Sequence, residues 1–308
     1  MKLTLEHVYY LTGAFLLIFS LFTAVDKKHN KRWGTAAFWF LYGVTFLAGT
    51  KLTDEVVGGM VVLMAAIVAC KQMGSGSYNE ASREERQARA DKFGNRLFIP
   101  ALLVGLITLL VAKFTTLGAL VGLGIGAVVA LLLTLGLTRE KPLQTCNEGR
   151  RLIDAIGWAA ILSQLLAALG YLFDKAGVGQ VVAGIVSSIV PSESALAAVI
   201  AYCLGMMLFT MIMGNAFAAF AVITSGIGLP LVIKVHGADP AIAGVIAMLA
   251  GFCGTLITPM AANFNVVPAA LLEMVNKNGV IRAQVMMALP LICVNILLMY
   301  FLALPGGR

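Results

Sequence analysis

Apolar residues occur along this chain in long blocks, separated by short stretches that contain charges, glycine or proline. Residues 97–137 hold a single charge, Lys113, in a length sufficient for two membrane spans of about 20 residues each. The same reading predicts apolar segments at 8–25, 34–50, 56–72, 97–112, 115–137, 152–173, 177–191, 194–213, 216–234, 240–258, 261–275 and 285–304.

Some of these segments are too short to cross a bilayer. Residues 177–191, 216–230 and 261–275 each run for about 15 residues between Gly or Pro, which favours half-helices or re-entrant segments over full spans. The pattern therefore predicts an all-α, polytopic transmembrane helix bundle of about ten hydrophobic segments, with broken or re-entrant helices among them.

Composition supports lipid as the solvent of this bundle. The 308 residues are 60% hydrophobic and 12% charged, whereas a soluble domain is about 25% charged. So much apolar surface cannot be hidden inside one water-soluble globule. The lipid bilayer is accordingly the first expected partner.

The net charge of +7 is placed in loops. Basic residues gather in 26–33, 74–96 and 138–151, whereas the alternate turns carry one lysine each, and this asymmetry predicts that the three basic loops face the cytoplasm. The N-terminus is then expected outside, with 8–25 as a first span and not a cleaved signal peptide. No folded basic face for nucleic acid is expected. Within 74–96, the E-x-x-R spacing suggests a short surface helix, with a solvated loop as the alternative.

We expect a single membrane domain over residues 1–308. A faint internal repeat pairs Trp39 with Trp158 and Lys113 with Lys234, and such repeats are common in secondary transporters. The sequence leaves their relative orientation open. The expected parts are a first span and basic loop (1–32), a first repeat (33–151), a second repeat (152–275) and a final span (276–308).

Two interrupted segments in the second half are the candidate solute site. Polar and helix-breaking residues punctuate 205–230 and 251–274, and irregular backbone at membrane depth occurs only where it is buried in protein or lines a wet cavity. The candidate substrate-binding residues are Asn215, Thr224, Ser225, Gly226, Thr255, Thr258, Pro259, Asn263 and Asn265.

The type of site follows from the absence of arginine in the predicted spans. A carboxylate would be held by helix N-terminal N–H groups together with Asn and Thr side chains. The alternative is that these Asn and Thr residues link helices through ordinary hydrogen bonds, while Gly226 and Pro230 bend them.

Two carboxylates near segment ends, Asp154 and Glu273, are candidates for carrying a coupling proton or sodium ion, with a solvated end charge as the alternative. No cofactor, metal site or disulfide framework is expected, because the five cysteines and three histidines do not cluster. Motifs of hydrolases, metalloproteases and P-loop enzymes are absent, so the chain is not expected to be an enzyme.

Several stretches together resemble the DUF979 family of bacterial membrane proteins over nearly the whole chain. They include RRLIDAIGWAAILSQLLAALGYLFDKAGVG (150–179), MGNAFAAFAVITSGIGLP (213–230) and FCGTLITPMAANFNVVPAALLE (252–273), with GTAAFWFLYGVTFLAGT and GNRLFIPALL earlier in the chain.

The resemblance implies a subunit of a two-component permease for 5-oxoproline, partnered by a DUF969-type membrane subunit and related to the ion-transporter superfamily. It places the chain in the bacterial cytoplasmic (inner) membrane, and it carries over no binding residues. A carrier for another small carboxylate, a non-transporting membrane scaffold and a homo-oligomeric assembly remain open alternatives.

Overall fold

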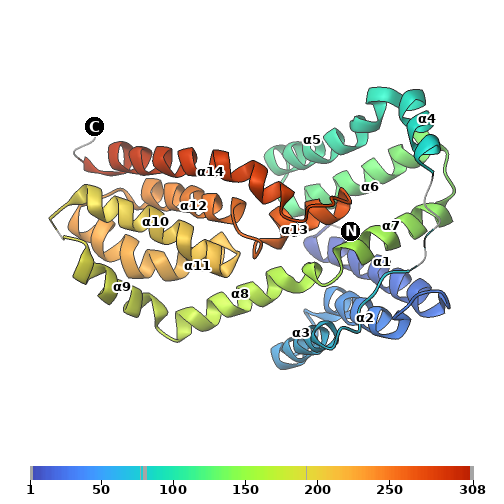
Figure 1. Cartoon of the computed structure of the whole chain (residues 1–308), viewed down its shortest axis with the longest axis horizontal. Coiled ribbons are helices and arrows are strands. Elements are labelled where there is room, and N and C mark those ends of the chain that lie inside the picture. The colour runs from blue at the N-terminus through green and yellow to red at the C-terminus, as the bar shows by residue number, and fades with distance from the viewer. Residues whose placement is uncertain (1–2, 77, 79–81, 192, 306–308) are drawn as a thin grey trace. The chain divides into compact units, whose positions relative to one another are not determined.

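The computed structural model describes residues 3–76, 78, 82–191 and 193–305. Every regular element in this part of the chain is a helix, which confirms the all-α class (Figure 1). The helices group into two units, residues 1–157 and residues 158–308.

The first unit contains seven α-helices among its described residues. They are α1 (Leu5–Val25), α2 (Arg32–Ala48), α3 (Asp54–Ala69), α4 (Arg83–Phe93), α5 (Ile99–Phe114), α6 (Ala119–Thr138) and α7 (Pro142–Ile156), with a 3-10 turn, η1 (Gly94–Phe98), between α4 and α5.

The second unit contains α8 (Ala159–Lys175), α9 (Val178–Ile189), α10 (Ala195–Met213), α11 (Ala216–Ile223), α12 (Pro240–Leu256), α13 (Ala262–Leu271) and α14 (Gly279–Leu298). Two π-helical segments, η2 (Thr224–Val235) and η3 (Met299–Ala303), continue α11 and α14.

Six helices in the described residues are long and apolar enough to cross a membrane, or seven if one broken pair counts as a single span. The chain is therefore a polytopic membrane protein, but the prediction of about ten segments counted shorter helices as well. Helices α9, α12 and α13 have 12, 17 and 10 residues, which is below the roughly 20 residues that cross about 30 Å of hydrocarbon.

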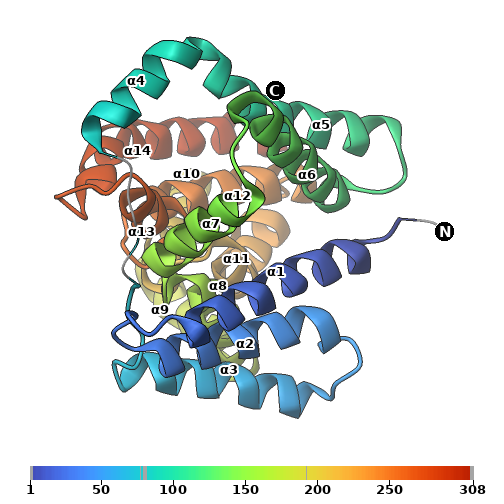
Figure 2. The ribbon, with the colours of Figure 1, turned by 90° about the vertical axis from the view of Figure 1, so that its right-hand side faces the viewer.

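Two helical hairpins, α1–α2 and α5–α6, organise the first unit. Figure 2 shows α1, α2 and α3 side by side, and α5 packs along α6. Glycines allow the close approach in both hairpins, since a Cβ on Gly43 would lie 3.1 Å from the Gly13 carbonyl oxygen and one on Gly126 would lie 2.9 Å from that of Val104. The Ser20 hydroxyl adds a hydrogen bond of 2.7 Å to the Ala36 carbonyl.

The polar segment after α3 contains the expected surface helix, α4. Ser82 accepts from the Glu85 N–H at 3.1 Å, and Glu85 accepts from the Ser82 N–H at 3.1 Å. This reciprocal capping box satisfies two backbone donors and starts the helix. The alternative of a solvated loop over 74–96 is thus wrong for residues 83–93.

The expected single segment at 152–173 is divided in two. Helix α7 ends where Gly157 takes a left-handed φ of +55°, and its N–H donates to the Ile153 carbonyl at 2.8 Å. Helix α8 begins at Ala159. A glycine adopts this conformation at no steric cost, so the helix can end here. The apolar residues continue on both sides of Gly157, and hydropathy alone therefore does not reveal the end of the helix.

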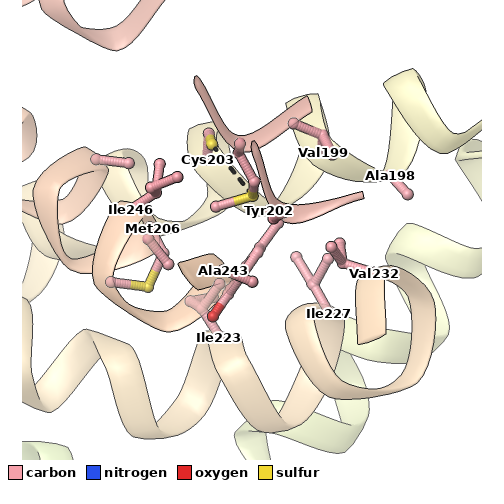
Figure 3. Packing of buried hydrophobic residues seen from close by; sticks show 14 of the residues in the cluster. Ala198, Val199, Tyr202, Cys203, Met206, Ile223, Ile227, Val232, Ala243 and Ile246 are labelled. Carbon is pink, nitrogen blue, oxygen red and sulfur yellow. Dashed lines mark hydrogen bonds between the residues drawn. The ribbon is translucent and has the colours of Figure 1, made fainter. Parts of the chain in front are cut away.

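The core of the second unit lies between α10, α12, η2 and the end of α14. Tyr202, Cys203 and Met206 of α10 pack against Ile227 of η2 and Ile246 of α12 (Figure 3). Glycine sets the spacing of α10 and α12, because a Cβ on Gly254 would lie 3.1 Å from both the Met207 carbonyl carbon and the Thr210 Cβ. Small residues here let two backbones approach in place of a hydrophobic driving force.

This packing predicts that Gly254→Ala destabilises the second unit. The added methyl group has to push α10 and α12 apart, at a cost of about 1–3 kcal/mol for overpacking. The midpoint of thermal unfolding in detergent should fall. In the same helix, Gly244→Ala is the matched control, because its Cβ would meet only Phe220 at 3.6 Å, an ordinary contact. Equal midpoints for the two variants would contradict the tight packing.

Candidate functional site

The first chain break separates α10 from α11. Gly214 has a φ of +65° and donates its N–H to the Thr210 carbonyl at 2.7 Å, which closes the last turn of α10. Asn215 then starts α11, because its Oδ1 accepts from the N–H groups of Phe217 at 2.9 Å and Ala218 at 3.3 Å. Asn215 is therefore a helix N-cap whose amide nitrogen is not used by the cap.

The second break separates α12 from α13. Thr258 donates its hydroxyl to the Met211 carbonyl at 2.9 Å and accepts from the Met260 N–H at 3.2 Å. Asn265 donates through Nδ2 to the carbonyls of Thr255 at 2.8 Å and Thr258 at 2.7 Å. These side chains replace the partners that the backbone loses where the helix is interrupted.

The two breaks touch each other. The Cα of Gly214 lies so close to the Met260 carbonyl that any side chain at residue 214 would collide with it. The hydrogen bond from Thr258 to Met211 joins the same two segments. The interruptions near Asn215 and Pro259 therefore meet within the second unit.

A cavity of about 210 Å³ lies at this meeting point. Its walls come from α8, the first turns of α11 and α13, and the end of α12. The polar groups that line it belong to Ser163, Asn215, Thr255 and Asn263, and Ser163 donates to the Asn263 Oδ1 at 3.1 Å. None of the described residues that line it carries a charge.

Aromatic rings form the apolar part of the wall. The Phe252 ring meets Phe217 edge-on with centroids 6.1 Å apart, and its centroid is 6.5 Å from that of Phe264. An apolar wall beside a few placed polar groups is the usual composition of a small-molecule site. The volume matches about seven water molecules at roughly 30 Å³ each, which suits a small solute.

Electrostatics at the cavity are set by the backbone. Helices α11 and α13 both begin at the lining residues, so the positive ends of two helix dipoles meet there, although several of the first N–H groups are already bonded within the protein. With no charged side chain among the described lining residues, the arrangement favours an anion held by N–H, amide and hydroxyl groups.

Five of the nine predicted binding residues lie at the cavity or directly behind it. Asn215, Thr255 and Asn263 line it, while Thr258 and Asn265 hold its backbone in place. Pro259 belongs to the second break, between Thr258 and Met260, and is not among the lining residues.

The predicted break at Thr224, Ser225 and Gly226 is wrong. The chain stays helical there and forms the π-helix η2. Pro230 lies inside this helix, and because proline lacks an N–H and its ring clashes with the preceding turn, the helix is wider than an α-helix. Thr224 bonds the Tyr202 hydroxyl at 2.8 Å, and Ser225 donates to the Val222 carbonyl at 3.0 Å. Gly226 packs against Gly179. Residues 216–235 consequently form one helix long enough to span, not a half-helix.

Neither candidate coupling residue is among the residues that line this cavity. Glu273 is exposed just after α13, with a φ of +51°, and is not among the lining residues. Asp154 belongs to the first unit, and its carboxylate is fully buried next to His29. The interpretation of Asp154 as a solvated end charge is therefore wrong.

Sequence reasoning missed Ser163 and the three phenylalanines of the wall. Ser163 interrupts the apolar run 152–173, which was a usable signal for a polar position facing protein. The phenylalanines carried no signal, because the many apolar residues of a membrane helix look alike in sequence and only the fold selects those at the cavity.

A family model described as "Protein of unknown function (DUF979)" matches residues 6–304. No curated protein and no solved structure matches the chain.

The geometry predicts that water reaches Asn263 but not Asn265, whose exposed fraction is 1%. In a variant without the five native cysteines, Asn263→Cys should react with a small charged thiol reagent faster than Asn265→Cys, by about tenfold or more, because reaction needs an accessible thiolate. Labelling rates measured by mass spectrometry test this. Equal, slow rates would show that the cavity is dry.

Proposed function

This chain belongs to the DUF979 family, and on that premise and the site geometry we propose that it is a membrane subunit of a secondary carrier for a small organic anion. The observation that carries the proposal is the meeting of two chain breaks at one neutral, polar-lined cavity with two helix N-termini. Secondary transporters bind solutes at such interrupted helices.

The proposed substrate is 5-oxoproline, as the family resemblance implies. Its carboxylate is attracted by the positive dipole ends of α11 and α13 and accepts from the Asn263 amide, because the N–H groups of Phe217 and Ala218 are already bonded to the Asn215 cap. Its lactam N–H and C=O need one acceptor and one donor, which hydroxyl and amide groups such as those of Ser163 and Asn263 can supply. Another small carboxylate would meet the same groups, and competition against 5-oxoproline separates the two.

The proposed transport cycle is alternating access driven by a proton or sodium gradient, together with a DUF969-type membrane subunit. In the bound state, the solute replaces water at the donors of the cavity. Because the carboxylate is paired with dipoles and not with a fixed positive charge, release requires no ion pair to be broken. A site of this kind suits a solute that must bind and leave on either side.

One observation favours a non-transporting scaffold instead. The hydrogen bonds of Thr258 and Asn265 satisfy the second break within the protein, so these residues would be needed in a scaffold as well. Asn263 distinguishes the two functions better, since its hydrogen bond in the structure is to the single hydroxyl of Ser163 at the cavity wall.

We expect Asn263→Ala to reduce uptake of labelled 5-oxoproline by about tenfold or more, because a bound anion would lose a donor worth about 1.5–3 kcal/mol. Uptake is measured in cells that contain this chain and its partner, with both proteins quantified in the membrane. The matched control is Asn147→Ala, an exposed asparagine on α7.

Two outcomes contradict the proposal. Normal uptake by Asn263→Ala with normal assembly would favour the scaffold. Wild-type cells that take up no more 5-oxoproline than cells without the two chains would rule out this substrate.

A further inference from the structure

A buried polar cluster in the first unit joins four segments that are far apart in sequence. Its centre is the carboxylate of Asp154 on α7, which accepts from the Trp39 indole N–H of α2 at 3.4 Å and from the Tyr78 hydroxyl of the segment after α3. His29, in the turn between α1 and α2, places its Nε2 3.4 Å from the same carboxylate. The side chains of His29 and Asp154 are both fully buried.

The backbone fixes the tautomer of His29. Its Nδ1 accepts from the Lys31 N–H at 3.1 Å, so this nitrogen carries no proton and the ring proton lies on Nε2. Nε2 therefore points its proton toward Asp154, although the contact lacks the alignment of a hydrogen bond, and Nε2 has no bonded partner among the described residues. The imidazole is neutral in this arrangement.

The remaining charges around the pair do not cancel. Arg150 of α7 bonds Asp26 at the end of α1 at 2.8 Å and the Phe22 carbonyl at 2.9 Å, and its guanidinium lies 5.0 Å from the Tyr78 ring centroid. Lys31 directs its ammonium to the Lys71 carbonyl instead of to the pair. One arginine against two aspartates leaves the described cluster with a charge of −1.

Tyr78 contributes as a neutral donor. Burial and the neighbouring Asp154 carboxylate raise the pKa of the Tyr78 hydroxyl well above its usual value, so it keeps its proton at physiological pH. The cluster thus holds one negative charge in a buried place, where Trp39 and Tyr78 donate to the Asp154 carboxylate from two other segments. One added proton would make it neutral.

We propose that the His29–Asp154 pair is a proton-binding site, in which His29 takes up one proton on Nδ1 and becomes an imidazolium paired with the Asp154 carboxylate. The proton comes from water and no bond other than N–H forms. Protonation converts Nδ1 from acceptor to donor, so the Lys31 N–H loses its partner and the turn before α2 must rearrange. Proton binding is thereby linked to a change at the start of α2.

This site has a place in the proposed carrier. A coupling proton needs a buried group that changes charge near neutral pH, and histidine is the side chain with that property. The use of the pair in coupling rests on the proposed function, whereas proton binding itself does not. A titration without substrate therefore tests the site even if the carrier proposal fails.

Trp39 reports on the pair, because its indole shares the Asp154 carboxylate with His29. In a Trp33→Phe/Trp158→Phe variant, Trp39 is the single tryptophan of the chain. Its emission in detergent should change in one step as the pH is lowered. The step should vanish in His29→Gln and persist in His7→Gln, a control on a half-buried histidine that pairs with Thr4.

Tyr78→Phe provides a second variant with a stated sign. It removes one donor from the carboxylate and leaves more negative charge beside His29, so the proton binds more tightly and the midpoint moves to higher pH. Nitrogen-15 NMR of labelled histidine gives a measurement on the unmutated chain. One of the three residues, which is assigned by His7→Gln and His236→Gln, should show a proton on Nε2 alone at high pH and on both nitrogens at low pH.

Three results would overturn the proposal. They are the absence of any step in the variant whose single tryptophan is Trp39, a step that survives when His29→Gln is added to it, and a His29 ring whose nitrogen signals do not change as the pH is lowered. Normal titration combined with absent uptake would instead remove the carrier function and leave the proton site.

Discussion

A peptide group at membrane depth has to find its hydrogen-bond partner inside the protein, and the second unit is arranged around the two places where a helix ends. Several of the missing helical bonds are replaced by side chains. Asn215 caps α11, Thr258 links its own turn to α10, and Asn265 holds two carbonyls of the second break. The bond from Thr258 to Met211 joins the break after α12 to the end of α10, so the two breaks lie next to each other.

The pairing has a chemical result. Two helix starts at one cavity bring the positive ends of two helix dipoles together at a place where no described lining residue carries a charge. The same residues that prevent unpaired peptide groups therefore create the property from which anion binding is proposed. Most residues of the proposed binding site therefore also hold the fold together, and Asn263, which lines the cavity, is the residue whose substitution best separates the two roles.

Much of this could be predicted from sequence because the helices are apolar and their ends are marked chemically. The segment predicted at 194–213 is observed as Ala195–Met213, and the one at 240–258 as Pro240–Leu256. Glycine, asparagine and proline mark those ends. The prediction failed at Pro230, where a proline widens a helix instead of ending it, since packing against Tyr202 and Gly179 keeps the segment helical. It also failed for Asp154, because burial of a carboxylate depends on partners that lie far away along the chain.

The Asp154 cluster has a consequence for the order in which the first unit matures. Trp39 and Tyr78 precede their common acceptor by 115 and 76 residues. At about 5–20 residues per second, the ribosome makes Asp154 roughly 6–23 s after Trp39. During that interval the turn before α2 and the segment after α3 have no carboxylate to join. The contacts of Trp39, Tyr78 and His29 with Asp154 can therefore form only after α7 has been synthesised. A chain that ended before α7 would lack the carboxylate that these three residues share.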